Sequence, residues 1–192
     1  MAAEGLAAMA LGLGLGFSLA GPPGPVNALI AREAVRGGAW AGIRVGYPAP
    51  LLDTLALLLV FFGLPHLVDV SRWAPLLSGV GAILLGAIAI DIARIRAEPK
   101  PIAASAVWAL TLSNPFFYAW WPSVGASFLA ATGVWGAAGF LLAIFGWVAL
   151  FSFLMAHGAS RWAWFAPVVS LLSADGLAAF ALLLALRAAS GL

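Results

Sequence analysis

The stretch Ala20–Ala31 reads A-G-P-P-G-P-V-N-A-L-I-A and lies inside an uncharged apolar run from Gly5 to Ile30. The run is longer than the ~20 residues that a helix needs to cross a bilayer, so it predicts a membrane helix. Three prolines inside it, at positions 22, 23 and 25, remove amide donors and clash with the preceding turn, so they break the helix. Opened backbone is stable in a membrane only where protein buries it or where it lines a cavity. The break therefore predicts a binding site; the alternative is a kinked, well-packed span without a ligand.

The composition of the whole chain agrees with a membrane protein. Of the 192 residues, 64% are hydrophobic and 8% are charged, whereas a soluble domain carries about 25% charged residues. The absence of cysteine excludes disulfides and thiolate chemistry, and the basic residues are scattered over separate loops rather than gathered into a nucleic-acid face. We therefore predict an all-α integral membrane protein with six spans, at residues 5–30, 43–64, 73–93, 102–124, 132–156 and 163–186.

The distribution of basic residues predicts how the spans are oriented. Residues 101–160 contain no charge, so they hold two spans joined by a neutral turn within residues 122–133, which we expect to be non-cytoplasmic. Two of the basic residues, Arg72 and Arg187, belong to the same side as this turn. The other seven lie in the three alternate loops: Arg32, Arg36, Arg44, Arg94, Arg96, Lys100 and Arg161. The positive-inside rule then predicts a multi-pass protein of the cytoplasmic membrane with both termini outside.

The two halves of the chain, residues 1–98 and 99–192, share short motifs at nearly one offset. The offsets are 90, 92 and 93 residues for the pairs Gly24-Pro25 and Asn114-Pro115, Ala74-Pro75 and Ala166-Pro167, and Gly46-Tyr47 and Gly139-Phe140. These matches predict two three-helix repeats with breaks in the first and fourth helices. Because three is odd, the second repeat is inverted, an arrangement found in secondary transporters. The alternative is two unrelated halves with similar proline positions.

Glycines recur at four-residue spacing in the first two predicted spans. Gly12 and Gly16 lie in the first, while Gly38, Gly42 and Gly46 lead into the second. Small residues at this interval let helix backbones approach closely, so we expect tight helix contacts here.

Two acids, Asp53 and Asp175, fall near the middle of predicted spans. An ionised carboxylate at this depth costs roughly 2.5 to 3.5 kcal/mol, so each acid is expected to face a cavity or a partner, or to be protonated. Both are candidates for binding a substrate ammonium group and for proton coupling. The alternative is a hydrogen bond that only ties two helices together.

The predicted helix breaks supply the complementary polarity. The half-helices after Pro25 and Pro115 both begin near the midplane, and helix N-termini favour anions such as a substrate carboxylate. Asn27 and Asn114 are placed to cap these helices or to contact the same group. Together with the aspartates, these residues predict a site for a zwitterion, with walls from aromatic side chains: Tyr47, Tyr118, Trp120 and Trp121.

One longer pattern resembles a known family. The run from Pro22 to Gly46, P-P-G-P-V-N-A-L-I-A-R-E-A-V-R-G-G-A-W-A-G-I-R-V-G, is followed by Asp53 and later by L-S-N-P-F-F at residues 112–117. This pattern resembles the LysE/RhtB amino-acid exporter family. The resemblance implies efflux of amino acids or similar small solutes, driven by proton exchange and without a cofactor. The chain differs at Leu52, where the family often has glycine, and at Phe116, where it often has lysine; these differences concern the substrate more than the fold.

Three other functions remain open at this stage. A divalent-cation exporter of the same fold is the closest rival, because aspartates, asparagines and opened carbonyls are hard oxygen ligands. An intramembrane enzyme would need Ser78 as its nucleophile, but that residue lacks a G-x-S-G context. A non-transporting packing subunit is the third. The expected partners are the lipid bilayer, protons and a small amino-acid-like molecule, with no nucleic acid; the oligomeric state is left open, a homo-oligomer included.

Overall fold

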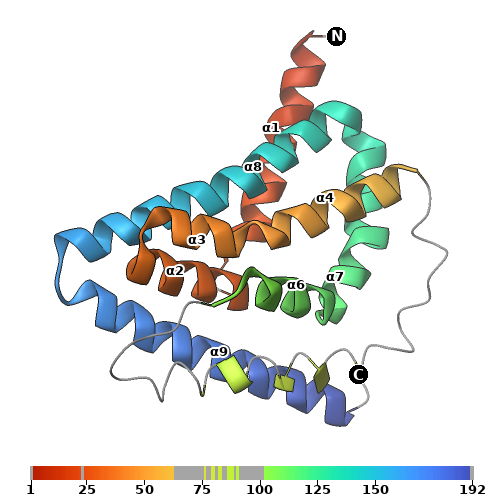
Figure 1. The fold of residues 1–192 in the computed structure, drawn as a ribbon. Coiled ribbons are helices and arrows are strands. Elements are labelled where there is room, and N and C mark those ends of the chain that lie inside the picture. Colours follow the sequence, from red (N-terminus) through yellow and green to blue (C-terminus); the bar gives the residue numbers. More distant parts are fainter. Residues whose placement is uncertain are drawn as a thin grey trace.

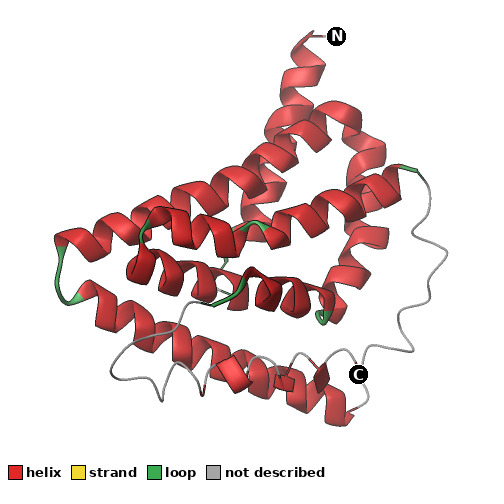
Figure 2. Cartoon of the chain, viewed as in Figure 1, coloured by secondary structure: helices red, strands yellow, loops and turns green. Residues whose placement is uncertain are grey.

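The computed structural model describes residues 2–22, 24–62 and 102–190, together with short stretches between residues 76 and 90. Every regular element in this described part is helical (Figure 2), which agrees with the all-α prediction. The third predicted span, residues 73–93, lies largely outside the described residues. The division into two inverted repeats at residues 1–98 and 99–192 therefore stays a prediction.

Two long helices enclose a layer of shorter ones. In Figure 1, α8 and α9 flank the layer formed by α2, α3, α4 and α6, and α1 crosses α8. A π-helical turn, η3 (Trp121–Gly125), joins α7 to α8. The helices in chain order are α1 (Ala2–Ala20), α2 (Pro25–Gly37), α3 (Ala39–Gly46), α4 (Pro48–Phe61), α6 (Ala104–Leu112), α7 (Pro115–Trp120), α8 (Ala126–Arg161) and α9 (Phe165–Ser190).

Several helical stretches are long and apolar enough to cross a membrane. Within the described residues, these are Ala3–Ala20, Ala39–Phe61 and Ala126–Arg161. The second of them comprises α3 and α4, which meet at Tyr47 with helical backbone angles. These lengths support a multi-pass membrane protein.

Both helix breaks occur where the prolines predicted them. Helix α1 ends at Ala20 and α2 begins at Pro25, so the first break lies between these two residues. Helix α6 ends at Leu112 and α7 begins at Pro115, so the second break comprises residues 113 and 114. Proline fits the first position of a helix because the amide of that residue has no acceptor there in any case.

The first helix packs against α8 with its backbone in contact. A side chain added at Gly12 would run into the carbonyl oxygen of Gly136, and one added at Gly139 would run into the carbonyl oxygen of Met9. A Cβ at Gly16 would lie 2.6 Å from Ala143 Cβ and 2.8 Å from the carbonyl oxygen of Phe140, which is also too close. The predicted close approach at Gly12 and Gly16 is therefore confirmed, and it fixes α1 at the edge of the site.

The second glycine series has two different roles. Gly38 has a positive φ of 81° and turns the chain between α2 and α3. A Cβ at Gly42 would lie 2.7 Å from both Ala34 Cβ and Ser152 Oγ, and Gly46 faces side chains of α2 and α8 as closely. The glycines therefore allow α3 to pack between α2 and α8.

The segment that follows the first break is helical and partly buried. The prediction that Arg32, Arg36 and Arg44 lie in a loop was wrong, because α2 and α3 occupy this region and only Gly38 between them is non-helical. Arg32 is 3% exposed and Glu33 is 2% exposed, and Glu33 accepts hydrogen bonds from Arg32 Nη1 and Arg36 Nη2, each at 2.7 Å. A buried charge with an oppositely charged partner is much less unfavourable than an unpaired one. Arg32 and Glu33 can therefore be buried while α2 continues as a helix.

The neutral turn predicted within residues 122–133 is also mostly helical. The π-helical turn η3 and the first residues of α8 occupy it, and the chain changes direction at Gly133, whose φ is 59° and ψ is −150°. The reversal is therefore present, but one glycine makes it rather than an open loop.

Candidate functional site: a cavity between the helix breaks

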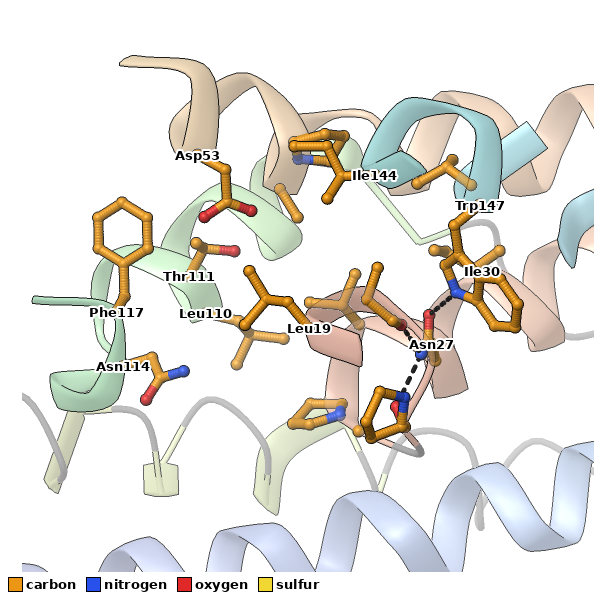
Figure 3. A pocket seen from close by; sticks show the side chains of 18 of the residues that line it. Leu19, Asn27, Ile30, Asp53, Leu110, Thr111, Asn114, Phe117, Ile144 and Trp147 are labelled. Carbon is orange, nitrogen blue, oxygen red and sulfur yellow. Dashed lines mark hydrogen bonds between the residues drawn. The ribbon is translucent and has the colours of Figure 1, made fainter. Parts of the chain in front are cut away.

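A cavity of about 430 Å³ borders both helix breaks (Figure 3). Its wall contains residues from the end of α1, the start of α2, the end of α6 and the start of α7, with further residues from α4 and α8. This volume lies within the range of about 300 to 1,000 Å³ that is common for small-molecule sites. The structure therefore brings the two predicted breaks to one space.

Asp53 provides the charge of this cavity. Figure 3 shows its carboxylate, carried by α4, directed into the space. Its Oδ1 accepts a hydrogen bond of 3.0 Å from Trp121 Nε1, and the Trp121 ring packs at 4.9 Å from that of Trp120, measured between centroids. Within the described residues this indole is the one donor to Asp53, and no other charged side chain lines the wall. The remaining carboxylate lone pairs are directed at the cavity.

Asn27 lies on the opposite side and holds the first break open. Its amide nitrogen donates to the carbonyl oxygens of Ala20, at 2.7 Å, and Pro22, at 2.9 Å. Its Oδ1 accepts from Trp147 Nε1 at 3.2 Å. Both amide hydrogens are used on carbonyls that α1 leaves without a helical partner, so Asn27 can donate to a ligand only by releasing one of them.

The second break is held mainly by the backbone. The amide of Asn114 donates to the carbonyl oxygen of Thr111 at 3.2 Å, and the amide of Phe117 donates to that of Asn114 at 3.1 Å. The hydroxyl of Tyr118 donates to the carbonyl oxygen of Leu112 at 2.9 Å. Tyr118 therefore supports the end of α6 and is absent from the described cavity wall.

The predicted site residues separate into two groups. Tyr47 packs against Phe145, with 5.6 Å between ring centroids, and Asp175 lies on an exposed face of α9; neither lines the cavity. Pro115 begins α7, and its side chain lies outside the described part of the structure. The wall does contain these predicted residues: Pro25, Asn27, Asp53, Asn114, Trp120 and Trp121.

Sequence reasoning missed two polar residues of the wall, Trp147 and Thr111. A signal for Trp147 existed, because an indole N–H in the middle of a long uncharged segment needs an acceptor. Thr111 lies three residues before Asn114, next to the second break, which is the position from which a side chain of α6 can reach the opened backbone.

Long apolar helices and a cavity at two helix breaks define a multi-pass membrane protein with the layout of a secondary transporter. The family model of the LysE type translocators matches residues 17–189. The chain therefore belongs to the LysE type translocator family, whose members are transporters rather than enzymes.

The chain is similar to YcgF of Bacillus subtilis strain 168, which is named for a proposed role in amino acid efflux. The two are 28% identical over 129 residues, which is 62% of this chain and 62% of YcgF. No solved structure matches the chain.

Proposed function

We propose that this chain exports amino acids or similar small solutes across the cytoplasmic membrane in exchange for protons. The observation that carries the proposal is the Asp53 carboxylate on the wall of a cavity that borders both helix breaks. Membership of a translocator family supports transport, and the name given to YcgF supports amino acids as the transported class.

The substrate ammonium group binds Asp53, and its carboxylate binds near the start of α2. Gly24, Pro25 and Val26 line the cavity at this start. The helix itself provides no acceptor for the amides of its first residues, and the dipole of α2 places partial positive charge there. Figure 3 shows Asp53 and Asn27 on opposite sides of the space, so a ligand in the cavity has an acid on one side and the start of α2 on the other.

The surroundings of Asp53 support the proposed proton exchange. A carboxyl group in a largely apolar wall, with one indole donor, is neutralised either by a proton or by a bound ammonium group. Asp53 then binds either the substrate ammonium group or a proton, but not both. A proton taken up on one side of the membrane replaces the substrate that is released on that side. This competition couples substrate export to proton entry.

The orientation that we propose places both termini outside and the basic segments in the cytoplasm. Ser127, at the start of α8, and Trp40, at the start of α3, are both exposed and lie on opposite sides in this orientation. A cysteine at Ser127 is expected to react with an impermeant thiol reagent added to intact cells, whereas a cysteine at Trp40 is expected to react only after lysis. The reverse pattern would contradict the orientation.

The transported class is tested by counterflow in proteoliposomes that contain the purified protein. Liposomes loaded with an unlabelled amino acid are expected to accumulate the labelled one, and liposomes loaded with divalent cations are expected not to exchange them. Exchange of cations without exchange of amino acids would instead support the divalent-cation exporter. The described wall provides one carboxylate, and within the described residues no cluster of three acidic or imidazole side chains occurs.

A further inference from the structure

Thr111 differs from the other described hydroxyls of the helices around it. Hydroxyl groups in apolar helices usually donate to a carbonyl of the preceding turn, which satisfies them without a tertiary partner. Thr54 does so with Pro50 at 2.7 Å, and Ser113 does so with Ala109 at 2.7 Å. The Oγ1 atom of Thr111 is buried and has no hydrogen-bond partner among the described residues, although the carbonyl of Val107 lies one turn earlier in the same helix.

A buried hydroxyl without a partner costs free energy, so its position needs a reason. One other described hydroxyl, that of Ser152, is buried and unpartnered as well. Ser152 lies against Gly42 at the crossing of α3 and α8, outside the cavity wall, where a small side chain is needed for close packing. Thr111 lines the cavity, so of these two described hydroxyls it is the one placed to meet a ligand.

The neighbours of Thr111 indicate which part of a ligand it meets. Figure 3 shows Thr111 at the end of the cavity that also carries Asp53 and Asn114, away from Asn27 and the start of α2. An ammonium group has three donors in a tetrahedral arrangement, and a single carboxylate does not use all of them. A hydroxyl oxygen beside Asp53 accepts one of the remaining donors.

The rest of the wall defines the side chain of the substrate. Leu19, Ile30, Leu110, Phe117 and Ile144 contribute apolar surface around the polar end (Figure 3). A second ammonium group, as in lysine, finds no second carboxylate among the described lining residues, and a second carboxylate finds no basic side chain there. Apolar surface instead fits a neutral side chain.

We infer that the Thr111 hydroxyl and the Asp53 carboxylate together form the ammonium subsite for a neutral amino acid with an apolar side chain. This inference rests on the proposed function and identifies the substrate class and one specificity residue of the same cavity. The carboxyl group supplies the charge, and the hydroxyl supplies a directed acceptor that an analogue without an amine cannot use.

The test uses Thr111→Val, which keeps the shape and removes the hydroxyl, with Thr111→Ser to restore it and Thr54→Val as the matched control. Leucine counterflow in proteoliposomes gives the half-saturating concentration for each protein. We expect this concentration to rise at least about tenfold in Thr111→Val, since hydrogen bonds to charged groups are worth about 1.5 to 3 kcal/mol. Thr111→Ser and Thr54→Val are expected to stay within about threefold of wild type.

Two further measurements separate a binding role from a structural one. In Thr111→Val, competition by leucine methyl ester, which keeps the amine, is expected to weaken as much as leucine binding does. Competition by 4-methylpentanoate, which lacks the amine, is expected to be the same as in wild type. The thermal midpoint of Thr111→Val without substrate is expected to equal or exceed that of wild type, because the variant removes an unsatisfied buried hydroxyl. A lower midpoint with equal losses for all ligands would indicate a structural residue and overturn the inference.

The outcomes also separate this inference from the proposed function. Wild-type protein without any amino acid counterflow would overturn both. Wild-type counterflow of leucine with unchanged affinity in Thr111→Val would overturn the ammonium subsite alone. Preferred counterflow of lysine or glutamate over leucine would overturn the neutral substrate class, while amino acid export itself would still hold.

Discussion

The two helix breaks are built differently. At the first break, prolines at positions 22, 23 and 25 keep the chain from continuing as a helix, and Asn27 satisfies two carbonyls that are thereby left open. At the second break a single proline, Pro115, follows Asn114, and backbone hydrogen bonds carry the chain across it. Side-chain bonds from Asn27 bridge the first opening, whereas main-chain bonds and the Tyr118 hydroxyl support the second.

This difference separates the tasks of the polar residues around the cavity. Asn27 uses its donors on Ala20 and Pro22, so its first task is to maintain the opening. At the second break main-chain bonds and Tyr118 contribute to this work, and among the described residues the buried Thr111 hydroxyl has no hydrogen-bond partner. A residue that is conspicuous in the sequence can therefore be architectural, while we propose that an inconspicuous neighbour faces the ligand.

The largest expected effect on stability is that of Asn27→Ala. The variant removes three hydrogen bonds, one exposed and two partly buried, and each is worth about 0.5 to 1.5 kcal/mol. Water can reach part of the opened site, so we expect a loss of about 1 to 3 kcal/mol. Thermal or denaturant unfolding of the purified protein measures it. Wild-type stability in this variant would show that the prolines alone hold the first break.

The next effect concerns the number of prolines at each break. Alanine at Pro115 restores the one missing amide of the second break, whereas alanine at Pro25 leaves two prolines in the first. We expect transport to fall at least about tenfold in Pro115→Ala, equivalent to ~1.4 kcal/mol, and to fall less in Pro25→Ala. Amino acid flux in proteoliposomes measures both, with thermal unfolding to verify that each variant is folded. Equal transport in Pro115→Ala and wild type would remove the second break from the mechanism.

The smallest effect is expected for Tyr118→Phe. This variant removes one hydrogen bond, from the Tyr118 hydroxyl to the carbonyl oxygen of Leu112, at a break whose backbone bonds remain. The expected loss of stability is about 0.5 to 1.5 kcal/mol, with substrate affinity unchanged. A marked loss of affinity with unchanged stability would return Tyr118 to the cavity wall, where the sequence had suggested it.

The sequence predicted those features that depend on local backbone chemistry. Proline cannot donate an amide wherever the chain is placed, so both breaks could be located before the structure was known. Glycine spacing likewise identified Gly12 and Gly16, since close helix approach requires small side chains at one interval. These properties belong to the residue itself and its immediate neighbours.

Features that depend on distant partners could not be predicted in this way. Asn27 and Trp147 are 120 positions apart, and nothing in either neighbourhood indicates the other. Asp53 and Asp175 occupy similar depths in the sequence pattern, but the rotation of each helix decides that only Asp53 lines the cavity. Arg32 was assigned to a loop because its burial, at 3% exposed, depends on how α2 packs in the fold; its ion-pair partner Glu33 is its neighbour in the sequence.

Asp53 and Asp175 provide the most direct test of the account, because asparagine preserves the shape of each side chain and removes only its exchangeable charge. Purified wild-type protein, Asp53→Asn and Asp175→Asn are reconstituted into liposomes, and amino acid flux is recorded with and without an imposed pH gradient. The account predicts that Asp53→Asn loses gradient-driven flux and that Asp175→Asn, changed outside the cavity, keeps it. Gradient-driven flux that persists in Asp53→Asn would contradict the central role of this carboxylate in the cavity.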